Sequence, residues 1–182
     1  MDAHGYAVFE TPIGQCGVIW GEHGITGTLL PASDARQMQA RIRRRAPAAQ
    51  PLPPPPDVQH AIHEMARLLH GEPRDLTSIG LDLAAVDPFN VRVYEAARAI
   101  PPGRTLTYGQ LAAQIGEPGA ARAVGQALGQ NPFPIVVPCH RVVAAGGKMG
   151  GFSAPGGVTT KLRMLAIEGA AMTTPLPLFE SV

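Results

Sequence analysis

Residues 107–131 read TYGQLAAQIGEPGAARAVGQALGQN, which is the layout of a helix-turn-helix. Thr107 is a suitable N-cap for a first helix that runs to Ile115, and residues 116–119 supply the turn. A second helix is predicted over residues 120–130. Its many small residues would let it approach another surface closely, such as a DNA groove. Helix pairs of this kind also occur in bundles, so the pattern alone leaves DNA contact open.

Immediately downstream, residues 133–143 read FPIVVPCHRVV. Residues 135–137 predict a buried strand that Pro138 ends, which places Cys139 at the strand end beside His140. A thiolate is a nucleophile, and cationic or basic neighbours lower a thiol pKa from its reference of about 8.5. Adjacent side chains on an extended chain point in opposite directions, so a Cys139–His140 contact needs a turn or a bridging water. The alternative is a buried structural cysteine followed by surface residues.

The first half of the chain predicts a sheet with helices. Apolar, β-prone runs separated by turn residues predict strands over residues 6–10, 17–20 and 25–30, with a further short strand over 81–83. Helical spacing and capping residues predict helices over residues 33–45, 57–70 and 91–100. The proline-dense stretch APAAQPLPPPP at residues 46–56 predicts an extended loop.

Together these elements predict an α+β protein. We expect an N-terminal domain, residues 1–87, with an antiparallel sheet and helices. Residues 88–182 then form a mostly helical, winged-helix-like domain that carries Cys139.

Composition excludes several classes of protein. Of 182 residues, 45% are hydrophobic, yet no apolar run approaches the ~18 residues of a membrane span. The two cysteines, Cys16 and Cys139, are too few for a disulfide scaffold, so we expect them to be reduced. Cys16 is expected to be a small buried residue. No signal peptide is visible, which favours the cytoplasm, with association to the nucleoid in a bacterium.

The net charge of +1 conceals an uneven distribution. Residues 1–100 carry nine Lys/Arg and eleven Asp/Glu, whereas residues 101–182 carry six and three. The C-terminal part is therefore mildly basic, although random scatter of surface charge would also give such a difference. The run of arginines at residues 43–45 is expected to be a solvated helix end.

The segment IVVPCHRVV at residues 135–143, preceded by Asn131 and Pro132, resembles the active-site segment of the O6-alkylguanine-DNA alkyltransferases. These are also called methylated-DNA–protein-cysteine methyltransferases. Supporting matches are IPPGRTLTY at 100–108, AARAVG at 120–125 and MLAIEG at 164–169 with Lys161 before it. The resemblance covers residues 81–169 well, and the first 80 residues only in layout.

The resemblance implies a role for each matching side chain. Cys139 would take the alkyl group from O6 of guanine and keep it as a thioether. His140, acting through a water, would deprotonate the thiol, and Glu168 would orient His140. Tyr108 would donate its phenolic proton toward the leaving guanine. Asn131 would be the hinge between the recognition helix and the active-site strand.

The resemblance also implies how DNA is held. Arg122 would enter the base stack and fill the place of the flipped nucleotide. The other residues expected at DNA are Thr107, Tyr108, Ala121, Ala123 and Gly125. The base pocket is expected to be lined by Pro134, Val142, Phe152 and Ser153. Many relatives have Tyr at the position of Phe152, and residues 154–155 are a two-residue insertion, so the accepted alkyl size stays open.

The implied function is stoichiometric DNA repair, in which O6-alkylguanine and O4-alkylthymine in double-stranded DNA each consume one protein molecule. We expect a monomer that needs no cofactor and binds no membrane. Some relatives bind zinc, but here a lone Cys16 without paired spacing argues against a metal site. Two alternatives stay open. A relative that only binds alkylated DNA would lack the reactive Cys139, and a Cys139–His140–Glu168 hydrolase would leave the helix-turn-helix unexplained.

Overall fold

The computed structural model describes residues 3–148 and 156–170. Its N-terminal half contains a four-stranded sheet in the order β3-β2-β1-β4. The strands are β1 (Ala3–Phe9), β2 (Cys16–Gly21), β3 (Gly24–Leu29) and β4 (Gln50–Pro51). The first three form the expected antiparallel meander, whereas β4 pairs parallel to β1. The proline-dense segment is therefore not entirely loop, because two of its residues extend the sheet.

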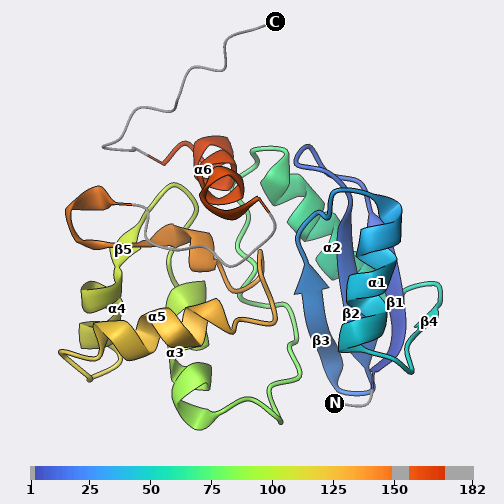
Figure 1. The fold of residues 1–182 in the computed structure, drawn as a ribbon, viewed down its shortest axis with the longest axis horizontal. Coiled ribbons are helices and arrows are strands. Elements are labelled where there is room, and N and C mark those ends of the chain that lie inside the picture. Colours follow the sequence, from blue (N-terminus) through green and yellow to red (C-terminus); the bar gives the residue numbers. More distant parts are fainter. Residues whose placement is uncertain (1–2, 149–155, 171–182) are drawn as a thin grey trace, which may run out of the picture.

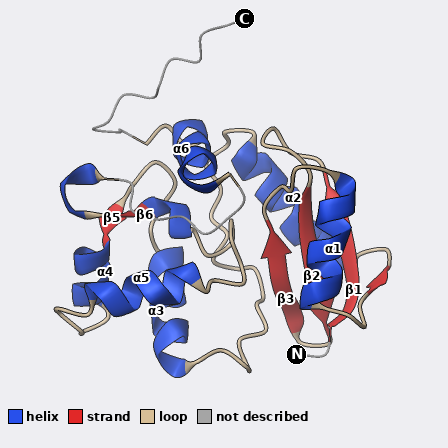
Figure 2. Cartoon of the chain, viewed as in Figure 1, coloured by secondary structure: helices blue, strands red, loops and turns tan. Residues whose placement is uncertain are grey.

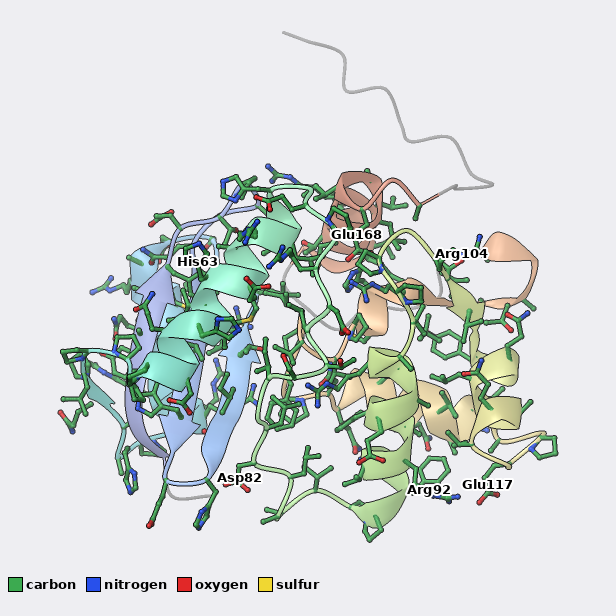
Figure 3. All side chains as sticks on the ribbon, turned by 180° about the vertical axis from the view of Figure 1, so that it is seen from behind. His63, Asp82, Arg92, Arg104, Glu117 and Glu168 are labelled. Carbon is green, nitrogen blue, oxygen red and sulfur yellow. The ribbon has the colours of Figure 1, made fainter. Side chains whose placement is uncertain are left out.

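Two helices cover opposite faces of this sheet, α1 (Ala35–Arg45) and α2 (Pro56–Leu69) (Figures 1 and 3). Alternation along β2 explains the arrangement, since successive side chains of a strand point to opposite faces. Ile19 packs with Met38 of α1, whereas Val18 and Trp20 pack in the cluster that contains Met65 of α2. The sheet thus has apolar side chains on both faces, and each helix buries one of them.

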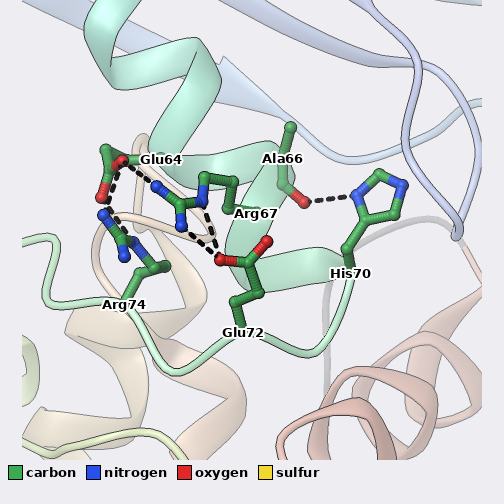
Figure 4. A network of polar contacts seen from close by, with 6 residues as sticks. All are labelled: Glu64, Ala66, Arg67, His70, Glu72 and Arg74. Carbon is green, nitrogen blue, oxygen red and sulfur yellow. Dashed lines mark hydrogen bonds and ion pairs between the residues drawn. The ribbon is translucent and has the colours of Figure 1, made fainter.

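The end of α2 is tied to the following loop by polar contacts (Figure 4). Arg74 donates hydrogen bonds to both carboxylate oxygens of Glu64, at 2.7 and 3.0 Å. Arg67 forms an ion pair with Glu72 at 2.6 Å. Pairs this exposed contribute little each, at most about 1 kcal/mol. They nevertheless orient the chain as it leaves the N-terminal half.

The C-terminal half is mostly helical, as expected (Figure 2). Its elements are α3 (Pro88–Arg98), β5 (Leu106–Thr107), α4 (Tyr108–Gln114), α5 (Ala121–Gly129), the 3₁₀ turn η1 (Cys139–Arg141), β6 (Val142–Val143) and α6 (Gly157–Ile167). The helix-turn-helix is confirmed as α4 and α5. Thr107 caps α4 in a capping box with Gln110, which fixes where the helix begins.

Two strand predictions were wrong. Residues 135–137 lie in a turn, and the strand is β6, whose Val142 pairs parallel to Leu106. The apolar run is too short and lies between Pro134 and Pro138, which have no N–H group to donate to a ladder. The predicted strand at residues 81–83 is a single bridge.

The largest apolar cluster joins both halves of the chain, because it contains Trp20 and Met65 as well as Val93 and Phe133. The domain boundary at residues 87/88 stays a prediction. Within the described residues, no helix is long and apolar enough to cross a membrane.

Candidate active site and nucleic-acid interface

Cys139 begins the single turn of η1, directly after Pro138. The backbone N–H of Arg141 donates to the carbonyl of Pro138 at 2.9 Å and closes this turn. Cys139 is half-buried, whereas His140 is completely buried. The chain therefore turns at the cysteine, which was the condition for the two neighbours to act together.

His140 is held by a buried carboxylate from a distant part of the chain. Its Nε2 lies 2.8 Å from Oε1 of Glu168. Glu168 is the C-cap of α6 and is labelled in Figure 3. Arg141 also binds Glu168, with Nε 3.0 Å from Oε2 and Nη2 2.8 Å from Oε1. In the described part of the chain, Nδ1 of His140 is buried without a hydrogen-bond partner. One ring nitrogen is thus oriented by Glu168, and the other is available for proton transfer.

The pKa values of this group follow from its surroundings. Burial alone would raise the pKa of Glu168, but the hydrogen bonds and charges of His140 and Arg141 lower it to about 2. Burial lowers the pKa of His140, and the contact with Glu168 only partly offsets this. At neutral pH the site therefore holds an ionised carboxylate against a neutral imidazole, which can accept a proton.

The thiol of Cys139 is subject to opposing effects. Burial raises its pKa, whereas a hydrogen bond from the Asn131 side chain and the positive charge of Lys161 lower it. Burial dominates, so the net pKa is raised and the thiol is protonated at neutral pH. Such a thiol needs a base to become a nucleophile.

Lys161 was not among the site residues predicted from the sequence. Its side chain is completely buried, its Nζ donates to the carbonyl of Val142 at 2.6 Å, and it lies 5.9 Å from the centre of the Tyr108 ring. Burial lowers its pKa to about 8, while the nearby Cys139 raises it. The available signal was its place on the apolar face of α6 with Met164 and Leu165, because a lysine at such a position is rarely buried without a partner.

Tyr108 connects this centre to the helix-turn-helix. It is the first residue of α4 and is half-buried, and burial followed by the nearby Cys139 raises the pKa of its phenol. A Cβ atom on Gly125 of α5 would lie 3.8 Å from the ring of Tyr108. The two helices therefore meet at this ring, next to the cysteine.

Four of the residues predicted to contact DNA lie near the N-terminus of α5, and their contact with DNA stays a prediction. Arg122 is exposed in the first turn, and Ala121, Ala123 and Gly125 are half-buried. Thr107 differs from the others, because its hydroxyl accepts the N–H of Gln110 at 3.1 Å as the cap of α4.

Asn131 fixes the backbone that leads to the cysteine. Its Oδ1 accepts from the N–H of Phe133 at 2.9 Å, and its Nδ2 donates to the carbonyl of Val137 at 2.9 Å. Of the expected pocket residues, Pro134 is half-buried and Val142 is buried. Phe152 and Ser153 lie outside the described residues.

Other polar residues singled out in the sequence lie elsewhere. Cys16 is completely buried and reduced, as expected, and burial raises its pKa to about 12. Arg43 and Arg44 are exposed, but Arg45 reaches the C-terminal half, so this run is not simply a solvated helix end. Among residues 3–148 and 156–170, no group of three or more His, Cys, Asp or Glu side chains is placed to hold a metal.

Comparison with known proteins gives consistent matches. Residues 88–170 match the family described as 6-O-methylguanine DNA methyltransferase, DNA binding domain. A methylated-DNA–protein-cysteine methyltransferase of Mycobacterium leprae is 37% identical over 171 residues, which cover 94% of this chain and 96% of that protein. Its counterpart in Mycobacterium bovis is 42% identical over 128 residues, which cover 70% and 75%.

Solved structures agree over most of the length. Mycobacterium tuberculosis OGT in complex with DNA superposes with a TM-score of 0.72 at 34% identity, covering 90% of this chain and 92% of that one. An O6-methylguanine-DNA methyltransferase from Pyrococcus kodakaraensis gives 0.72 at 32% identity, covering 91% and 99%. Fold, order of motifs and length all correspond, and this chain belongs to the methylated-DNA–protein-cysteine methyltransferase family.

Proposed function

We propose that this protein repairs DNA by moving the alkyl group of O6-alkylguanine to Sγ of Cys139, once per protein molecule. The observation that carries the proposal is the arrangement at η1. A protonated, half-buried thiol lies next to a neutral imidazole whose Nε2 is held by Glu168 and whose Nδ1 has no hydrogen-bond partner in the described chain. This arrangement suits the activation of a cysteine by a general base.

The step balances as a displacement at carbon. Nδ1 of His140 takes the thiol proton through a water, and the thiolate attacks the alkyl carbon. The S–C bond forms as the C–O6 bond breaks, and the electron pair passes to the purine. Tyr108 donates its phenolic proton to the guanine as it leaves, and solvent restores it. Because an alkyl thioether is a poor leaving group, the cysteine is consumed.

Lys161 supports this chemistry electrostatically. Its ammonium group is charged below about pH 8 and favours the thiolate of Cys139. The same group donates to the carbonyl of Val142, which fixes the strand that follows η1.

The substrate base must leave the duplex to reach Cys139. Rotating a nucleotide out costs a few kcal/mol and leaves a gap in the stack. Arg122 is exposed in the first turn of α5, and this supports a role in filling that gap. The small residues of α5 would allow close approach to the groove. Pro134 and Val142 would line the pocket for alkylated guanine or O4-alkylthymine. In a bacterium, the protein would work at the nucleoid, where the DNA lies.

Intact-mass spectrometry after incubation with duplex DNA that contains O6-methylguanine tests the transfer. We expect a gain of one methyl group per molecule, mapped to Cys139. Cys139→Ala should gain nothing, whereas the matched variant Cys16→Ala should gain the same methyl group. Two results would overturn the proposal. Protein that carries no methyl group while product is released would indicate a hydrolase. Protein that carries no methyl group while the substrate stays intact would indicate a relative that only binds alkylated DNA.

The role of Arg122 is tested with two substrates. We expect Arg122→Ala to slow repair of duplex DNA by roughly tenfold or more, because the flipped base loses its substitute in the stack. Reaction with the free base O6-benzylguanine should be unchanged, since no flipping is needed. Arg44→Ala, which removes an exposed arginine of α1, is the control for general loss of positive charge. Equal losses with both substrates would remove the proposed role of Arg122.

A further inference from the structure

The loop that leads to Cys139 holds an unfavourable backbone conformation. Ile135 has φ of +79° and is the one non-glycine residue with positive φ in the described part of the chain. A β-branched residue is a clear outlier in this region, and such conformations persist only where the surroundings over-determine them. Ile135 is buried, so its apolar contacts supply part of the compensation.

Hydrogen bonds from the N-terminal half hold the same loop. In β3, the backbone N–H of Thr28 donates to the carbonyl of Pro132 at 3.0 Å, and its hydroxyl donates to the carbonyl of Pro134 at 2.5 Å. Arg45, the last residue of α1, donates through Nη2 to the same carbonyl of Pro132 at 2.6 Å. The two carbonyls flank Phe133, whose side chain is completely buried. Three donors from outside the helical half thus converge just before Ile135.

The sheet offers this contact because β3 is an edge strand. Within the described residues its outer edge forms a single bridge, between Ile25 and Leu81, and the loop covers a further part of that edge at Thr28. Gly27 makes room for the arginine, since a Cβ atom there would lie 2.8 Å from the guanidinium of Arg45. The arrangement therefore depends on three features of the fold. Gly27 has no side chain, Thr28 supplies a hydroxyl, and the side chain of Arg45 is long enough to contact the loop.

We propose that Thr28 and Arg45 are positioning residues for alkyl transfer, holding the loop at residues 132–135 so that Cys139 is presented at the correct place and angle. This inference rests on the proposed function. It assigns the N-terminal half a direct part in the reaction, through backbone carbonyls and not through contact with the substrate. A displacement reaction requires the attacking sulfur to be well aligned, and a misplacement of about 1 Å can cost up to roughly a hundredfold in rate.

The test uses single-turnover transfer from O6-benzylguanine to the full-length protein, with the maximal rate separated from the half-saturating concentration. Thr28→Val keeps the shape and the backbone N–H but removes the hydroxyl. We expect it to lower the maximal rate by roughly tenfold and to leave the half-saturating concentration nearly unchanged. Thr28→Ser retains the donor and should restore the rate. Rescue by serine separates positioning from a general effect of the substitution on packing.

Arg45→Gln provides an independent variant, because Arg45 reaches the loop from a different element, α1, and is exposed. We expect a similar fall in maximal rate. Arg44→Gln, on the same helix turn, should have the maximal rate of the wild-type protein. Gly27→Ala should reproduce the effect of Arg45→Gln, and the double variant should be no slower than either alone, because both remove the same contact.

The inference is overturned if Thr28→Val and Arg45→Gln lower only the urea midpoint while their maximal rates stay unchanged under conditions where each is fully folded. It is also overturned if Thr28→Ser is as slow as Thr28→Val. If the wild-type protein gains no methyl group from duplex DNA that contains O6-methylguanine, the proposed function fails, and that result is distinct from both of these.

Discussion

The two cysteines share burial, a hydrogen-bonding side chain and a nearby cation, and they differ in whether a base adjoins the thiol. Burial raises the pKa of both thiols. Cys16 is completely buried in β2, and the polar side chain beside it is Thr11, whose hydroxyl lies 3.7 Å from the sulfur. Cys139 is half-buried in a turn, where Asn131 and Lys161 favour its thiolate and His140 adjoins it.

The difference shows what separates a structural thiol from an acceptor. Burial by itself stabilises the neutral thiol and protects it. Cys16 has a hydrogen-bonding side chain, Thr11, and a cation, Arg41, near its sulfur, so these alone do not make an acceptor. Cys139 adds an adjoining base, His140, that is oriented by Glu168, and a cation, Lys161, that is itself completely buried. Desolvation strengthens each of these interactions, so the raised pKa and the reactivity have a common origin.

The largest difference is expected in native-state alkylation by iodoacetamide. A pKa near 12 in place of 9.0 leaves Cys16 with roughly 10³-fold less thiolate than an ordinary cysteine at neutral pH. We expect one label per folded molecule, at Cys139, with Cys16 labelled only in denaturant. Mass spectrometry of peptides, with Cys139→Ala as the control, checks this. Labelling of Cys16 in the folded protein at a comparable rate would remove the contrast.

Much of this arrangement could be predicted from the sequence. The helix-turn-helix followed from the cap at Thr107 and the turn after Ile115, since local signals determine both. The sheet followed from apolar, β-prone runs separated by turn residues. The resemblance supplied the pairing of His140 with Glu168, which no local pattern connects across 28 positions.

Other features could not be predicted, for physical reasons. The apolar run at residues 135–137 satisfies the composition of a strand, but it lies between two prolines. A long-range hydrogen bond from Thr28 to the carbonyl of Pro134 and a local one from Asn131 to the carbonyl of Val137 hold it as a turn. The sequence gives Lys161 as a polar residue on a helix. Its burial cannot be predicted until the carbonyl of Val142 is known to accept a hydrogen bond from it. In both cases the deciding contact is between a side chain and a backbone carbonyl, and carbonyls carry no sequence signature.

The next largest effect is expected for Glu168→Gln. This substitution removes the carboxylate that orients His140, and so weakens the base that distinguishes Cys139 from Cys16. Burial already lowers the pKa of His140, and the contact with Glu168 raises it; without the carboxylate the imidazole becomes a weaker base. We expect single-turnover transfer from O6-benzylguanine to slow by about 10². The rate should fall as pH drops through the pKa of His140, which lies below 6.5, and in the variant this fall should occur at still lower pH.

The control for this variant is Glu117→Gln. Glu117 is an exposed carboxylate paired with Arg92 at 2.9 Å, and Figure 3 shows it well away from Glu168. Its loss should leave both the rate and the pH profile unchanged. If the pH–rate profile of Glu168→Gln is the same as that of the wild-type protein, the role of His140 as the base is contradicted.

A smaller effect is expected for Lys161→Met, which removes the cation but keeps the length of the side chain. Loss of one favourable charge should raise the thiol pKa and slow transfer from O6-benzylguanine by roughly tenfold at neutral pH. Lys161 has a lowered pKa of about 8, so it is charged below that pH and neutral above it.

The pH profile distinguishes this effect from altered packing. As pH rises from about 6 to about 9, Lys161 loses its proton, so the transfer rate of the wild-type protein relative to that of Lys161→Met should fall. The exposed Lys148 gives the matched control. Lys148→Met should have the transfer rate and pH profile of the wild-type protein. A constant ratio of the two rates across this pH range would indicate a role in packing alone.

The smallest effect on the reaction is expected at Cys16, where the contrast predicts none. Cys16→Ala removes one buried sulfur from the core and should lower the free energy of unfolding by about 1 kcal/mol, measured by urea titration. The transfer rate and its pH profile should stay unchanged, because no group near Cys16 acts on Cys139. A slower rate in fully folded Cys16→Ala would mean that packing around β2 is transmitted to the active-site loop. Since the neighbouring strand β3 holds that loop through Thr28, such a result would also mark the sheet as the route by which the two cysteines are coupled.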